Sequence, residues 1–253
     1  MKKLLTFLTA VFIGMTSLFA TACDPNSFNY ENGDKYTVGV AEVGANVTSL
    51  DIGWYMGKVC VEYAAVETIT FSESAEEELA EEIQVHHWLD GNTLHIQYGK
   101  DGLMMFYGVP KAKTLTVLIP QETVLQKLEI NSSSADIFVT DLRVNDVEIE
   151  NTFGDTKVSF ADVNEADINL IKGNGEATFT TAPKEGEFSV DSGALTVKFP
   201  ADTGFTAEME KGNGTINCDF DLTQKGEEYI SGDGAGQYDF EIYFSGTIHI
   251  QKL

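Results

Sequence analysis

The chain has 253 residues, of which 43% are hydrophobic, and a formal net charge of −24. This length and apolar content suffice for one substantial buried core or for two small ones. The excess of acidic side chains excludes a basic surface that would bind nucleic acid, and it makes anionic lipid headgroups equally poor partners. Cations, cationic polymers and neutral glycans are compatible with this charge.

Residues 1–22 have the organisation of an export signal. Lys2 and Lys3 are followed by an apolar stretch from Leu4 to Ala20 and by the small residues Ala20-Thr21-Ala22. The apolar stretch is at the short limit for a membrane span, so we expect residues 1–22 to be removed as a signal peptide. The mature chain would carry 14 basic and 40 acidic side chains, a net charge of −26.

Cys23 follows this signal directly, in the run Leu18-Phe19-Ala20-Thr21-Ala22-Cys23. The run resembles a bacterial lipobox, although Ala20 stands where that pattern usually has leucine. The resemblance implies lipidation of Cys23, and a diacylated cysteine would supply the second acyl chain that stable anchoring needs. The alternative is ordinary cleavage after Ala22, which would leave a free thiol. The polar residues that follow predict a flexible tether over residues 23–35.

The first half of the mature chain has the patterns of several strands. Alternation begins around residues 36–40, and Leu50-x-Ile52-x-Trp54 predicts a strand with one apolar face. The acidic run of residues 72–82 is compatible with a short helix or with a solvated loop. Two apolar runs flank Asp90-Gly91-Asn92, which predicts a hairpin. A further strand is predicted over residues 115–120.

The second half of the chain repeats about every twenty residues. Each repeat reads apolar-x-apolar, a small turn residue, and apolar-x-apolar again, and the turn residues are Ala135, Gly154, Gly175, Gly193 and Gly214. Such a period marks an architecture in which each unit buries its apolar side only by stacking on its neighbours. The stretch after Gly214 is irregular, as is expected of a terminal coil that needs a cap.

These patterns predict an all-β fold over residues 36–253. We expect a single-stranded parallel β-solenoid, similar to a β-helix, with coils of about 20 residues and irregular end caps. An antiparallel sandwich is the alternative, but that fold gives no reason for a repeat of about twenty residues.

In a parallel solenoid, equivalent outward side chains of successive coils form rows about 4.8 Å apart. The repeat, used as a template, predicts two such rows from the positions six and eight residues before each small turn residue. The first contains Glu129, Glu148, Asn169, Glu187 and Glu208, and the second contains Lys127, Asp146, Asp167, Glu185 and Thr206. Like charges at this spacing repel by roughly 0.9 kcal/mol in a water-like dielectric. The functional hypothesis is that the acids of this face bind a ligand or recruit divalent cations, calcium above all. The alternative is that they only keep the protein soluble.

The sequence contains no pattern that predicts catalysis or a dedicated metal site. It has no Gly-x-Ser-x-Gly elbow, no calcium-loop spacing and no zinc-like arrangement of its four histidines. We therefore predict a non-catalytic protein without a cofactor, with calcium on the acidic face as the one exception to be tested. A polysaccharide-degrading β-helix enzyme is an alternative, because carboxylates that could pair for glycoside cleavage occur throughout the chain. It is less favoured, because an abundance of carboxylates does not by itself define an active site.

Several of these motifs are similar to those of the bacterial putative-adhesin family of β-strand repeat proteins. They are Leu50-x-Ile-x-Trp-x-x-Gly-x-Val, Leu115-x-Val-x-Ile-Pro, Ile149-x-Asn151-x-x-Gly154-Asp155 and Ser245-Gly246-Thr247-Ile248. The resemblance covers roughly residues 47–250. It implies an exported, surface-facing β-solenoid-like domain, and it supplies no catalytic residues.

Two functions are compatible with this sequence. The first is a surface adhesin or envelope-binding module whose ligand is a glycan, the cell wall or a protein. The second is an envelope-stress sensor or structural accessory that acts with a membrane protein partner. In both we expect a cell-surface lipoprotein that contacts the membrane only through its lipid anchor, or a secreted protein if Cys23 is not lipidated.

Overall fold

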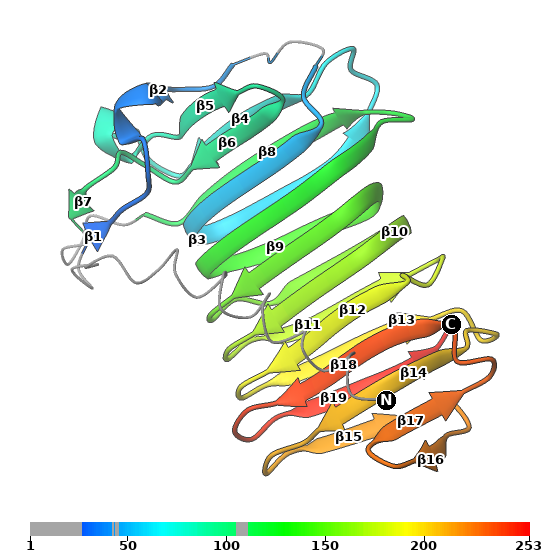
Figure 1. Cartoon of the computed structure of the whole chain (residues 1–253). Coiled ribbons are helices and arrows are strands. Elements are labelled where there is room, and N and C mark those ends of the chain that lie inside the picture. The colour runs from blue at the N-terminus through cyan, green and yellow to red at the C-terminus, as the bar shows by residue number, and fades with distance from the viewer. Residues whose placement is uncertain (1–26, 42, 44–45, 105–110) are drawn as a thin grey trace.

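The computed structural model describes residues 27–41, 43, 46–104 and 111–253, which form a long stack of strands (Figure 1). Most strands pair in parallel with the equivalent strand of the neighbouring coil. The prediction of a parallel β-solenoid is thereby confirmed. The expected signal peptide and Cys23 lie outside the described residues. Within the described part of the chain, no helix is long and apolar enough to cross a membrane.

Each coil contributes one strand to each of two sheets that enclose the core. In stacking order, the first sheet contains β6 (Thr93–Gln97), the start of β3 (Ser49–Ala64), both ends of β9 (Val124–Asn151), the end of β10 (Thr156–Leu170), β12 (Glu185–Val190), β18 (Gly236–Ile242) and β14 (Phe205–Glu210). The second sheet contains β8 (Lys113–Pro120), the end of β3, the middle of β9, the start of β10, β11 (Asn174–Phe179), β13 (Ala194–Phe199), β19 (Thr247–Lys252) and β15 (Thr215–Cys218).

Antiparallel strands cap both ends of the stack and cover strand edges that would otherwise be open. At the N-terminal end, β5 (His86–Asp90) pairs with β6, β2 (Thr37–Val38) pairs with β5, and β4 (Thr70–Ala75) pairs with β8. At the C-terminal end, β17 (Glu228–Ser231) pairs with β14, and β16 (Thr223–Lys225) pairs with β17. The predicted hairpin at residues 90–92 is therefore the connection between β5 and β6.

The remaining elements are short and belong to the N-terminal cap. The acidic run of residues 72–82 begins in β4, continues as an irregular segment and ends in the 3-10 turn η2 (Glu81–Ile83). The structure departs from the prediction of a flexible tether over residues 23–35. The last nine of these residues contain β1 (Ser27–Phe28), which pairs with β7 (Leu103–Met104), and the 3-10 turn η1 (Gly33–Lys35).

The core between the two sheets changes character along the stack. Its N-terminal half is mainly aliphatic, with residues such as Leu50, Ile130 and Ile149 almost completely buried. Its C-terminal half contains stacked phenylalanines, in which the rings of Phe179 and Phe199 lie 5.5 Å apart at an interplanar angle of 21°. Such ladders are possible because parallel pairing brings equivalent side chains of successive coils together.

The corners of the coils require glycine because the backbones approach closely there. A Cβ atom on Gly154 would lie 1.8 Å from the carbonyl oxygen of Ala135, and one on Gly173 would lie 2.0 Å from that of Gly154. The repeat template placed Gly175 at this corner, and this assignment was wrong by two residues. In the structure Thr156 is the partner of Gly175, so the corner position belongs to Gly173.

The coils are not stacked in the order of the sequence. The last coil, formed by β18 and β19, lies between the coil of β12–β13 and the coil of β14–β15. Strand β18 pairs in parallel with β12 on one side and with β14 on the other. The coil of β14–β15 therefore comes earlier in the sequence than the coil of β18–β19, although β18–β19 separates it from the rest of the stack.

Candidate functional site

The acidic face is the outward surface of the first sheet, and its middle row carries seven carboxylates. They are, in stacking order, Asp51, Glu129, Glu148, Asp167, Glu187, Asp239 and Glu208. A second row beside it contains Asp146, Glu165 and Glu185, and a third contains Glu150, Glu241 and Glu210. In the middle row, neighbouring members belong to adjacent strands, which places their backbones about 4.8 Å apart.

All seven acids predicted from the sequence are on this face, namely Glu129, Asp146, Glu148, Asp167, Glu185, Glu187 and Glu208. Two details of the predicted rows were wrong. Asp167, not Asn169, occupies the middle row, because the corner of that coil is Gly173. Asp239 separates Glu187 from Glu208, because the last coil is inserted between theirs. Both corrections make the middle row more acidic than predicted.

Within the described part of the chain, basic side chains contact carboxylates of the middle row only in its N-terminal half. Lys127 Nζ lies 2.9 Å from a carboxylate oxygen of Glu129 and 3.0 Å from one of Glu148. His95 Nδ1 lies 2.6 Å from a carboxylate oxygen of Asp51. Among the described residues, no lysine, arginine or histidine forms an ion pair with the other four acids of the row, Asp167, Glu187, Asp239 and Glu208.

Burial and mutual repulsion disfavour ionisation of the unpaired carboxyls. Partial burial, together with the charge of Glu165, raises the pKa of Asp167 to about 6. Burial and the charge of Glu241 raise the pKa of Glu187 to about 7. Burial also raises the pKa of Asp239 to about 6, with a contribution from Glu208. This part of the face therefore changes its charge between pH 5 and pH 8.

The chain is expected to become more stable on acidification from pH 8 to pH 5. A carboxyl whose pKa is raised on folding binds its proton more readily in the folded state, so its contribution is favourable at low pH and is lost as pH rises through the folded pKa. After allowance for solvent screening, we expect ~1 kcal/mol for each of Asp167, Glu187 and Asp239. Urea unfolding at both pH values would measure the difference.

The variant D167N/E187Q/D239N is the control for this pH dependence, and it should be less sensitive to acidification. His87 acts in the opposite direction, because partial burial lowers its pKa and the half-buried ring resists protonation. Comparison with the triple variant removes this contribution. An equal gain in stability for both proteins would show that these three carboxyls do not cause the effect.

The acidic face does not form a compact metal site in the described part of the chain. There, no three histidine, cysteine, aspartate or glutamate side chains gather closely enough to hold one metal ion. The carboxylates lie in extended rows, whereas calcium takes six to eight oxygen ligands around a single point. Recruitment of calcium by this face is still a prediction.

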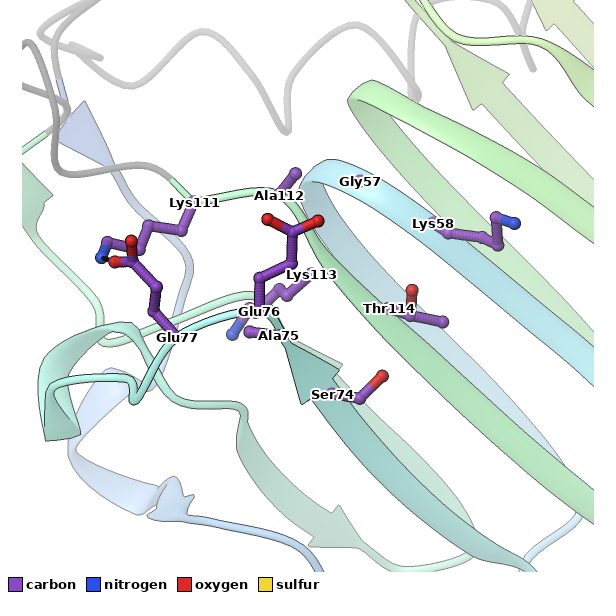
Figure 2. Close-up of a pocket in the computed structure, with 10 residues that line it drawn as sticks. All are labelled: Gly57, Lys58, Ser74, Ala75, Glu76, Glu77, Lys111, Ala112, Lys113 and Thr114. Carbon is purple, nitrogen blue, oxygen red and sulfur yellow. Dashed lines mark hydrogen bonds and ion pairs between the residues drawn. The ribbon is translucent and has the colours of Figure 1, made fainter.

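A separate concave region of about 820 Å³ lies on the second sheet, beside the N-terminal cap (Figure 2). Lys58, Ser74, Glu76 and Thr114 are among the residues that line it. Lys111 and Glu77 form an ion pair at one side. These groups can donate and accept hydrogen bonds with a small polar ligand.

The sequence matches the profile of one protein family, Toastrack DUF4097, over residues 49–178. The chain belongs to this family. The match begins at the first residue of β3 and ends in β11, so it includes the N-terminal half of the acidic face. A search of curated proteins found no match.

Two solved structures resemble this Toastrack chain. A putative cell adhesion protein from Clostridium sporogenes matches with a TM-score of 0.55 and 16% sequence identity, over 87% of this chain and 99% of that one. A putative adhesin from Bacteroides fragilis matches with a TM-score of 0.46 and 13% identity, over 87% of this chain and 97% of that one. At these identities, the first similarity supports the fold alone.

A buried ion pair of the Toastrack domain was missed at the sequence level. The side chain of Lys113 is completely buried, and its Nζ lies 2.8 Å from a carboxylate oxygen of Glu73. Lys113 Nζ also donates to the carbonyl oxygens of Ile83 and Tyr98. Burial lowers the pKa of Lys113 to about 8, and Glu73 opposes this shift. The signal was present, because strict alternation with Leu115 places Lys113 on the inward face.

Proposed function

We propose that this Toastrack chain is an exported, lipid-anchored surface protein that binds a cationic ligand through its acidic face and catalyses no reaction. The name of the first similar structure, a putative cell adhesion protein, supports a role in adhesion. The lipobox-like run supports an anchor at Cys23. A rigid stack of strands supports binding, because it holds many side chains at fixed spacing.

The observation that carries this proposal is the unpaired half of the acidic face. Asp167, Glu187 and Asp239 lie in direct register on adjacent strands, and no cation of the described chain pairs with them. Holding like charges this close costs free energy, and a positively charged partner would recover it. The partner chemistry is therefore a lysine- or arginine-rich protein segment or a cationic polymer.

Binding of poly-lysine to purified residues 23–253 would test the proposal. The variant D167N/E187Q/D239N should bind at least tenfold more weakly, because it removes the unpaired charges at the centre of the face. The matched control is E62Q/E67Q/D202N, which removes three exposed charges elsewhere. It should change the affinity less than twofold.

Two results would overturn the proposed role of the face. An equal loss in both triple variants would show that only net charge matters, and an unchanged affinity in the first would exclude this contact surface.

Calcium at millimolar concentration forms a separate arm, in which competition with poly-lysine would show that the same carboxylates bind the ion. Cross-linking in the native envelope that captures one membrane protein through this face would favour the sensor or accessory function.

A further inference from the structure

The segment that follows the proposed lipid anchor is fixed to the N-terminal end of the stack. Strand β1 pairs with β7, and the ring of Phe28 contacts that of the buried Tyr98 at a centroid distance of 6.1 Å. The hydroxyl of Tyr30 donates to the carbonyl oxygen of Gly99 at 2.9 Å. The amide nitrogen of Tyr30 donates to the carboxylate of Asp101 at 3.0 Å.

A second set of contacts holds the segment a few residues later. The ring of Tyr36 lies 5.8 Å from that of Trp88, and Lys35 Nζ lies 4.4 Å from the centre of the Trp88 ring. His95 stacks on the same indole at 5.1 Å and an interplanar angle of 16°. Residues 27–36 are therefore part of the folded domain and add no length to a tether.

These contacts limit how far the domain can lie from the anchor. Four residue steps separate Cys23 from Ser27, and a fully extended chain spans at most ~14 Å over that distance. A free tether over residues 23–35 would have reached ~45 Å by the same measure. The limit follows from covalent geometry, whatever path the intervening residues take.

We infer that the N-terminal end of the solenoid faces the bilayer directly and that its C-terminal end projects away from it. The inference rests on the lipid anchor at Cys23 in the proposed function. Strand β14 lies seven strand spacings from β6, which corresponds to ~34 Å along the stack. The unpaired acids of the face are consequently held away from the lipid headgroups, which would repel them if anionic.

Energy transfer to labelled vesicles would test this orientation. Residues 23–253, with Cys60 and Cys218 replaced by serine, would be coupled through Cys23 to a maleimide lipid in phosphatidylcholine vesicles that contain an acceptor dye. A donor would be placed by an unnatural amino acid at Lys100, near the N-terminal end, or at Gln224, near the C-terminal end. Transfer should be strong from position 100 and weak from position 224. Equal transfer from both positions would overturn the inference.

Two variants show whether the short tether causes the orientation. Insertion of twelve glycine and serine residues between Asn26 and Ser27 should reduce the difference between the two positions. F28A/Y30A should have a similar effect, because it releases the segment, whereas F153A changes an exposed ring elsewhere and should have none. A difference that persists with the long insertion would mean that another contact orients the domain.

The outcomes separate this inference from the proposed function. Coupling through the maleimide replaces natural lipidation, so equal transfer would leave the proposed binding function intact. Natural lipidation is tested by the mass of the N-terminal peptide and by detergent-phase partition of the native protein against C23A. A native Cys23 without acyl chains would overturn the anchor and this orientation together.

Discussion

Replacement of Lys113 by methionine is expected to lower the free energy of unfolding by ~3–5 kcal/mol. Methionine keeps most of the volume, so the loss comes from the charge that it leaves behind. Glu73 would lose its cation in a site where its side chain is only 11% exposed. The carbonyl oxygens of Ile83 and Tyr98 would lose their donor as well. Urea unfolding at pH 7 measures the effect.

A second variant distinguishes the stranded charge from a packing defect. K113M/E73Q should recover a large part of the loss, because glutamine is neutral and its carbonyl oxygen can still accept from the backbone N–H of Val85. K111M is the control, since Lys111 forms an exposed ion pair with Glu77 and should cost less than ~1 kcal/mol. A double variant less stable than K113M would contradict the electrostatic explanation.

Replacement of Gly173 by alanine is expected to destabilise the stack by about 3 kcal/mol. The new Cβ would lie 2.0 Å from the carbonyl oxygen of Gly154, and that oxygen belongs to the backbone of the neighbouring coil. The two coils would have to separate at this corner, which weakens the pairing on both sides of it. Thermal and urea unfolding would report the loss.

Gly175 provides the matched control, two residues away in the same turn. A Cβ atom there would lie 2.4 Å from Cδ1 of Leu170, the end of a side chain that can change rotamer. G175A should therefore cost about 1 kcal/mol, within the range for overpacking that side chains relieve. A larger loss in G175A than in G173A would contradict the register of this coil.

The fold could be predicted from the sequence because the repeat is a direct consequence of parallel stacking. Each coil must bury the same face, so apolar residues recur at fixed distances from each corner. The position of one corner could not be predicted, because Gly173 and Gly175 both stand in a turn and apolar residues precede both at suitable distances. Only the pairing of Gly175 with Thr156 distinguishes them.

The composition of the acidic face was predictable, whereas its order was not. Strict alternation identifies Glu187 and Glu208 as outward residues, whichever coils lie beside them. The insertion of β18 between their strands depends on long-range contacts, to which a local pattern is insensitive.

The burial of Lys113 was missed for a different reason. A lysine is almost never fully buried unless it is paired, and the partner of Lys113 is 40 residues away.

The position of the last coil has a consequence for how the molecule matures. A chain that leaves a ribosome or a translocation channel from its N-terminus delivers β14 and β15 before β18 and β19 exist outside. The solenoid cannot then be completed by adding coils one after another to a growing end. Strands β14 and β15 have no coil to stack on until β18 and β19 have paired with β12 and β13, so the stack becomes continuous only after the whole chain has emerged.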